Sequence, residues 1–158
     1  MEAVRAATAG DGHRLLDLAE ELVGGITSQR GGALLLDRGR LGRDAATGLG
    51  RINELLEHAG TRVVVGTLDE AVVGFAVCHF EDDGGHGRCG VLDACYVEPG
   101  ARGVGVGRLL LDAALSWLGE RGCQGVDGIA LPGDRKAKNF YESAGFKARM
   151  LTMHREVG

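Results

Sequence analysis

The chain has 158 residues, a length that suits one domain better than two and that can bury roughly 68–70% of the unfolded surface. Its net charge of −4 argues against a general nucleic-acid-binding protein, which would show a basic stripe and a high isoelectric point. The longest apolar stretch, residues 109–118, is too short and too interrupted to span a membrane, so we expect no membrane association. Residues 1–13 lack the apolar core of a secretory signal, and four scattered cysteines contain no Cys-x-x-Cys pair. We therefore expect a cytoplasmic protein with reduced thiols.

The first part of the chain predicts one short strand and two helices. Residues 3–7 have a β-like pattern, and residues 11–23 place their apolar side chains on one helical face, with a pair of glycines at the end. A second helix is predicted over residues 47–58. Residues 26–46 fit neither pattern clearly, and we expect a loop or an irregular helix that shapes a substrate pocket.

From residue 61 the apolar pattern changes to that of strands. Residues 62–67 and 72–80 are rich in valine and phenylalanine and predict a hairpin. Residues 81–85 read as a turn, and residues 89–97 as a third strand.

The last part of the chain predicts two helices that alternate with two strands. Residues 106–121 keep one apolar face over four turns and predict the longest helix. A strand is predicted over residues 125–131, and a short helix follows behind Asp134, which is a good N-cap. Residues 146–155 read as a last strand. The whole chain, residues 1–158, is therefore predicted to be one mixed α/β domain, with helices packed on a mostly antiparallel sheet.

A glycine-rich turn joins the third strand to the longest helix. Glycine lets the backbone approach a ligand closely, and the start of a helix offers unpaired N–H groups and a positive dipole end. These features together predict a phosphate site, to which Arg102 and Arg108 add positive charge. The Walker loop would need Lys followed by Ser or Thr, and the Rossmann fingerprint has a different glycine spacing, so both fit poorly.

Two motifs, in the correct order, resemble those of the GNAT N-acetyltransferases. Residues 97–110 resemble motif A, whose core Arg/Gln-x-x-Gly-x-Gly/Ala is met by Arg102, Gly105 and Gly107. Residues 137–146 resemble motif B, which ends in Gly-Phe. With their flanking elements the motifs occupy about residues 90–121 and 134–146, and the resemblance covers residues 1–60 in helix count only.

The resemblance implies the GNAT acyl-CoA N-acyltransferase fold and a function. The protein would be an N-acetyltransferase that uses acetyl-CoA as cosubstrate, needs no metal, and transfers the acetyl group directly to a primary amine of a small molecule or a protein. The positions implied to bind the coenzyme are Cys95, Tyr96, Val97, Arg102, Gly103, Val104, Gly105, Val106, Gly107, Arg108 and Asn139. A homodimer is compatible with the family, although no feature of the sequence supports it.

A non-catalytic alternative also fits the motifs. The same fold could bind acetyl-CoA as a sensor or as an interaction module without turnover. The enzyme predicts that some amine promotes release of CoA, whereas the sensor predicts binding without release.

Transfer of an acetyl group from a thioester to an amine requires a base and is helped by an acid. An alkylamine has a pKa near about 10.4 and must lose a proton before it attacks, and the departing thiolate is helped by an acid near the sulfur. By resemblance, Tyr141 is the candidate acid. Asp93 is the first candidate base, because strand alternation would place it on the face of Cys95. Glu81 is a second candidate, and a water chain to solvent is a third.

Two further interpretations are less favoured. Cys95 could act as a nucleophile, but no histidine is near it in sequence, and small buried cysteines are common. The residues from His79 to His86 could form a metal cluster, but their spacing favours a solvated acidic loop.

Overall fold

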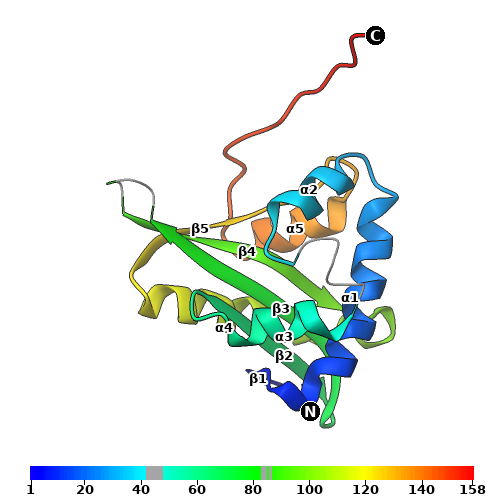
Figure 1. Cartoon of the computed structure of the whole chain (residues 1–158), viewed down its shortest axis with the longest axis vertical. Coiled ribbons are helices and arrows are strands. Elements are labelled where there is room, and N and C mark those ends of the chain that lie inside the picture. Colours follow the sequence, from blue (N-terminus) through cyan, green and yellow to red (C-terminus); the bar gives the residue numbers. More distant parts are fainter. Residues whose placement is uncertain (42–47, 83–84, 86) are drawn as a thin grey trace.

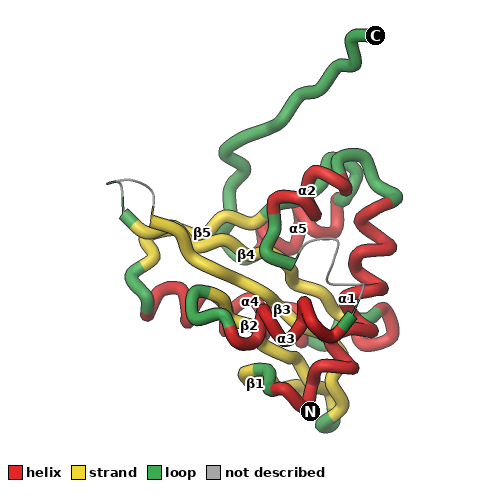
Figure 2. Tube along the Cα trace, in the orientation of Figure 1, coloured by secondary structure: helices red, strands yellow, loops and turns green. Residues whose placement is uncertain are grey.

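The computed structural model describes residues 1–41, 48–82, 85 and 87–158. Its centre is a five-stranded sheet in the order β1-β2-β3-β4-β5, in which β4 and β5 are parallel and the other neighbours are antiparallel (Figures 1 and 2). The strands are β1 Glu2–Ala6, β2 Thr61–Leu68, β3 Ala71–Asp82, β4 Arg88–Val97 and β5 Cys123–Gly128. The predicted mixed α/β class and the mostly antiparallel sheet are confirmed.

Helices cover both faces of the sheet. The helices are α1 Gly12–Thr27, α2 Gly32–Arg38, α3 Leu49–Glu57, α4 Val106–Glu120 and α5 Arg135–Ser143, with short 3-10 turns at Ala9–Asp11 and Pro99–Ala101. Side chains of α1 and α3 share one core cluster with the sheet, and those of α4 and α5 share the other. Among the described residues, none of these helices has the length and apolarity that a bilayer crossing requires.

The alternation of side chains along the strands separates the two cores. Val65 and Phe75 belong to the cluster under α1 and α3, whereas their neighbours Val64 and Ala76 belong to the cluster under α4. The first turn of α4 lies close to β2, because a Cβ atom on Gly66 would come within 2.5 Å of the Val106 side chain. Glycine at this position therefore lets the start of α4 approach the sheet.

Several element boundaries differ from the prediction. The first helix does not end at Gly24 but continues to Thr27, since its partly buried side chain Ile26 extends the apolar face. A glycine in a helix costs only about 1 kcal/mol, which further packing can offset. Strand β3 continues to Asp82, so Glu81 lies in a strand and not in a turn. The predicted helix start at Thr47 and the turn residues Asp83 and Gly84 lie outside the described residues.

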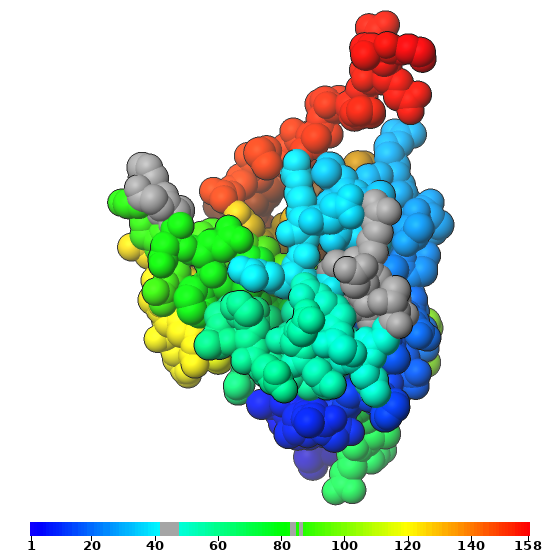
Figure 3. Space-filling model, viewed as in Figure 1, coloured from blue at the N-terminus to red at the C-terminus, as the bar shows by residue number. Residues whose placement is uncertain are grey.

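The predicted last strand over residues 146–155 is wrong for the single chain. These residues have no strand structure and lead away from the body of the protein (Figures 1 and 3). A strand is stable only when its N–H and C=O groups pair with those of a neighbour. The local sequence pattern cannot supply that neighbour.

The start of α1 is fixed by a buried carboxylate, and this has a consequence for stability. Arg5 donates two hydrogen bonds of 2.8 and 2.9 Å to Asp11, which also accepts from the Thr8 backbone. The Arg5 guanidinium lowers the pKa of Asp11 from 3.8 to about 2. We expect Asp11→Asn to lower the free energy of unfolding at pH 7 by about 2 kcal/mol, because each pKa unit corresponds to about 1.36 kcal/mol.

The effect should depend on pH in a defined direction. A lowered pKa stabilises the fold above pH 4 or so, and that contribution disappears as the pH falls toward 2. Urea unfolding at both pH values measures the difference. The control Asp69→Asn changes an ion pair whose carboxylate is 83% exposed, so it should cost under about 1 kcal/mol. Equal losses in the two variants would contradict the assignment.

Candidate functional site

The turn before α4 has the backbone geometry of an anion site. Gly103 and Gly105 adopt φ angles of +86° and +95°, a region that residues with a Cβ atom rarely occupy. A Cβ atom on either glycine would point into open space. The turn therefore needs glycine for its conformation and leaves room beside its backbone.

The N–H groups at the start of α4 point out of the helix. Gly105 is the N-cap residue, and among the described residues no side chain caps the helix there. The first N–H bonded back to the turn is that of Leu109, which donates to Gly105 at 3.2 Å. The preceding N–H groups of Val106, Gly107 and Arg108 therefore lack the intrahelical acceptors that later residues have, and they suit a phosphate or pyrophosphate.

Strands β4 and β5 diverge beside this turn. Their parallel pairing extends from Arg88 opposite Cys123 to Leu92 opposite Gly128. Beyond that point β4 continues to Val97, whereas β5 ends at Gly128. The backbone of the second half of β4, including Cys95, is thus not used by β5.

Tyr141 lies at the mouth of this divergence. Its ring fills the place that a side chain on Gly128 would take, because a Cβ atom there would lie 2.8 Å from Cε1 of the tyrosine. Phe140 and Phe146 pack on the ring with centroid distances of 5.7 and 5.2 Å. Burial, with smaller contributions from the charges of Cys95 and Asp134, raises the pKa of Tyr141, so its hydroxyl stays protonated near neutral pH.

Cys95 has the character of a packed thiol. Its Sγ lies 3.8 Å from the Gly107 carbonyl oxygen, and burial raises its pKa to about 12. A thiol with so high a pKa is a poor nucleophile near neutral pH.

The expected position of Asp93 is wrong, because β4 contains a bulge. In the register with β3, Val77 is opposite Ala94 but Cys78 is opposite Leu92, so Asp93 is the additional residue. The bulge interrupts the alternation of side chains. Asp93 therefore faces the layer of α1 to α3, and Cys95 faces α4.

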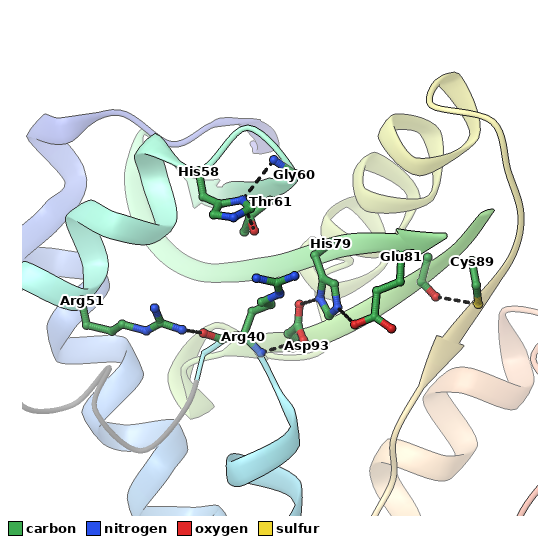
Figure 4. Close-up of polar contacts among 10 residues, drawn as sticks. Arg40, Arg51, His58, Gly60, Thr61, His79, Glu81, Cys89 and Asp93 are labelled. Atoms are coloured by element: carbon green, nitrogen blue, oxygen red, sulfur yellow. Dashed lines mark hydrogen bonds and ion pairs between the residues drawn. The ribbon is translucent and has the colours of Figure 1, made fainter. Parts of the chain in front are cut away.

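Asp93 is the inner end of a row of three charged side chains, shown in Figure 4. The side chain of Asp93 is fully buried. Its carboxylate accepts a hydrogen bond of 2.6 Å from His79 Nδ1 and one of 2.9 Å from the backbone N–H of Arg40. The other ring nitrogen of His79 lies 2.9 Å from Glu81 Oε1. The Glu81 side chain is 62% exposed. The row thus connects a buried carboxylate to solvent.

His79 can carry a proton between the two carboxylates. Burial would lower the pKa of His79, but the hydrogen bonds to Asp93 and Glu81 and the negative charge of Asp93 together outweigh burial, and the net pKa is raised. The interpretation of the His79 region as a solvated loop is therefore wrong for His79, which is 3% exposed. His86 lies outside the described residues.

Comparison with known proteins supplies the family. A model of the acetyltransferase (GNAT) family matches residues 36–146. The chain belongs to the GNAT family. The turn at the start of α4 and the helix α5 both lie within the matched region of this GNAT protein.

Similar proteins include an aminoglycoside N(6')-acetyltransferase type 1 of Stenotrophomonas maltophilia, which is 30% identical over 97 residues. The matched region spans 59% of this GNAT protein and 63% of that relative, which is less than two thirds of the relative's length. A mutant protein of Bacillus halodurans has the same fold, with a TM-score of 0.80, 20% identity and coverage of 98% and 99% of the two chains. An aminoglycoside N-acetyltransferase crystallised with CoA has a TM-score of 0.77, 19% identity and coverage of 99% and 95%.

The remaining predicted positions of this GNAT protein lie around the turn. Arg102 donates to the Val97 carbonyl oxygen at 2.8 Å and lies over the ring of Tyr96, whereas Arg108 pairs with Asp112 on the next turn of α4. Asn139 is exposed on α5. Val104, at the tip of the turn, is 46% exposed.

His79 is the functional candidate that sequence reasoning missed. Every second side chain of β3 points to the same face of the sheet, and Phe75, Val77 and His79 share the buried face. The alternation of side chains along the strand therefore predicts a buried imidazole. Its pairing with Asp93 could not be read in this way, because it depends on the bulge in the neighbouring strand.

Proposed function

We propose that this protein is an acetyl-CoA-dependent N-acetyltransferase that transfers the acetyl group directly to a primary amine. The observation that carries the proposal is the continuity of the site. The N–H groups of Val106, Gly107 and Arg108 lie at one end, and the divergence of β4 from β5 leads from them toward Tyr141. Acetyl-CoA has phosphates at one end and a thioester at the other, so its phosphates would lie at the N–H groups of α4 and its thioester near Tyr141.

The residues present suit the coenzyme at each part of its length. The turn from Gly103 to Arg108 would hold the pyrophosphate, with Arg102 adding positive charge. Backbone groups of Cys95, Tyr96 and Val97 would hold the pantetheine arm, and Asn139 would contact the arm or the pyrophosphate. Bound acetyl-CoA supplies the activated acetyl group. The nitrogen–carbon bond of the amide forms as the carbon–sulfur bond breaks, and Tyr141 donates a hydrogen bond to the departing sulfur.

The amine loses its proton through the row of charged side chains. Asp93 is too deeply buried to touch an amine, and both of its oxygens are occupied by His79 and Arg40. We therefore assign the contact with the amine to Glu81, the exposed end of the row. Asp93 then acts as a positioning residue, which fixes the ring of His79 and favours its protonated form.

The acceptor that we propose to test first is a small cationic amine. The exposed Glu81 carboxylate and the net charge of −4 both favour a positively charged acceptor. The names of similar proteins, which act on aminoglycosides, point in the same direction. Lysine side chains of proteins form the second class. We place the reaction in the cytoplasm, where the four cysteines would remain reduced.

Two measurements test the function. Acetyl-CoA at a hundredfold excess over its Kd should add about 2.7 kcal/mol to stability, which for this size raises the Tm by roughly 5–10 °C. A panel of amines, with free thiol as the readout, should then find at least one that promotes CoA release. No shift with millimolar acetyl-CoA or CoA would refute the proposal. A shift with no active amine would favour the sensor.

The pH dependence of kcat/KM tests the proton path. The row can accept a proton from the amine only after His79 has lost its own, so we expect the acidic limb to lie above the ordinary histidine pKa of about 6.5. Asp93→Asn removes one of the charges that raise this pKa and should move the limb to lower pH. The control Asp82→Asn, at an exposed position on β3, the strand that carries His79, should leave the limb in place. An unchanged limb in Asp93→Asn would contradict the role of the row.

A further inference from the structure

The residues that follow α2 fix the backbone of Arg40 beside the row of charged side chains. The Arg40 N–H donates to Asp93 Oδ1 at 2.9 Å, and the Arg40 carbonyl oxygen accepts from the guanidinium of Arg51. The next residue, Leu41, belongs to the core under α1 and α3 and is 3% exposed. The side chain of Arg40 therefore starts from a backbone position that contacts on both sides hold in place.

The guanidinium of Arg40 lies next to His79. In Figure 4 the ring of His79 stands between the Arg40 guanidinium and Glu81. The pKa of His79 reflects the same proximity, because burial lowers it and the positive charge of Arg40 lowers it further, although the contacts with Asp93 and Glu81 raise it overall. A positive charge and an exposed carboxylate thus flank one imidazole.

The Arg40 guanidinium has no carboxylate partner among the described residues. The carboxylate of Asp93 is directed at His79 and at the Arg40 backbone, and that of Glu81 contacts the other ring nitrogen of His79. Arg40 is nevertheless half-buried. A charged group that is partly withdrawn from water, and whose planar set of donors is not used by a protein carboxylate, suits the carboxylate of a bound molecule.

We propose that the acceptor is an amine that also carries a carboxylate, and that Arg40 determines this specificity. The inference rests on the proposed acetyl transfer and narrows its acceptor. The ammonium group of the acceptor approaches Glu81, the exposed end of the row, and its carboxylate accepts hydrogen bonds from the Arg40 guanidinium. Because the two protein groups carry opposite charges on either side of His79, a zwitterion complements both of them.

A carboxylate suits this position better than a phosphate. One guanidinium neutralises the single charge of a carboxylate, whereas a phosphate monoester carries about −1.5 to −2 near pH 7. The additional negative charge would lie near Asp93 and Glu81, which would repel it. Glu81 follows His79 by two residues on β3, a rise of roughly 7 Å, so the separation of amine and carboxylate in the acceptor should also matter.

Release of CoA with matched pairs of amines tests the inference. Each pair consists of an ω-amino acid, from glycine to 6-aminohexanoate, and its carboxamide, which keeps the amine but has no negative charge. In the native protein at least one acid should have a KM about 10- to 100-fold below that of its amide, because charge-assisted hydrogen bonds are the stronger ones. Arg40→Gln should bring the two KM values within about threefold of each other and change kcat little. Comparing the ratio of KM values between proteins removes the difference in basicity between acid and amide.

Two further variants separate the contact from general effects. Arg38→Gln is the matched control, because it removes an exposed positive charge two residues away, at the end of α2, and should keep the native ratio of KM values. Arg40→Lys keeps the charge but loses the planar pair of donors, so its ratio should be intermediate. Both substitutions of Arg40 leave its backbone contacts in place, and the Tm should stay close to that of the native protein.

The outcomes distinguish this inference from the proposed function. Acids that are no better than their amides in the native protein would overturn the inference, as would an equal loss for acids and amides in a folded Arg40→Gln variant. In both cases CoA release with the amides or with the wider panel of amines would leave the acetyl transfer standing. No CoA release with any amine would refute the proposed function itself, and this inference with it.

Discussion

Tyr141→Phe should lower kcat about 100-fold while the Kd for acetyl-CoA changes little. Phenylalanine keeps the ring that packs against Gly128, Phe140 and Phe146, so only the hydroxyl is lost. A hydrogen bond to a charged group contributes up to about 3 kcal/mol, and general acids contribute about 100-fold or more. Since about 1.36 kcal/mol corresponds to a tenfold change in rate, both values correspond to a loss of roughly 100-fold in kcat. The raised pKa of Tyr141 favours this lower end, because a weak acid stabilises the sulfur more by hydrogen bonding than by full proton transfer.

Single-turnover CoA release and isothermal titration separate the two quantities. Ser143→Ala is the matched control, since it removes another hydroxyl from the same helix, one that donates to the Phe140 carbonyl oxygen at 2.7 Å. It should leave kcat within about threefold, because surface changes of this kind cost little. A Tyr141→Phe enzyme with unchanged kcat would show that the thiolate leaves without help from this hydroxyl.

Gly105→Ala should weaken acetyl-CoA binding about 10- to 100-fold. The left-handed backbone at Gly105 would cost alanine roughly 1–2 kcal/mol, and the added methyl group would occupy the open space beside the N–H groups of α4. A shift of that backbone would weaken hydrogen bonds to a charged phosphate, each worth about 1.5–3 kcal/mol. Titration of acetyl-CoA into the variant measures the Kd.

A second glycine separates strain from binding. Gly122, at the other end of α4, has a φ angle of +82° and the same open surroundings. Gly122→Ala should therefore lose a similar amount of stability, about 1 kcal/mol, but keep the native Kd for acetyl-CoA. Equal affinity losses in the two variants would mean that general destabilisation, and not the turn, controls binding.

The sequence predicts those structural features of this protein that are formed by residues close together in the chain. The long helix α4, the glycines before it and the N-cap of α5 were predicted correctly, and Asp134 accepts from the Ala137 N–H at 3.0 Å as expected. Each depends on residues within one or two turns of the chain. The β2–β3 hairpin was also predicted, because its two strands are joined by a short link.

The local sequence pattern could not predict the row of charged side chains formed by Asp93, His79 and Glu81, or the structure of residues 146–155. Asp93 meets His79 because β4 bulges against β3, a matter of pairing between two strands that no period within one strand reveals. Residues 146–155 have the composition of a strand, yet in a single chain they lack a neighbour.

Local sequence features therefore predict the mixed α/β class, the glycine-rich turn before α4 and the position of Tyr141 on its helix. Those features arise from backbone preferences and contacts between near neighbours in the chain. The tertiary structure alone decided which face Asp93 occupies, that His79 connects it to Glu81, and that β5 remains an open edge. These depend on the register between strands distant in sequence, and register is set by how whole elements pack together.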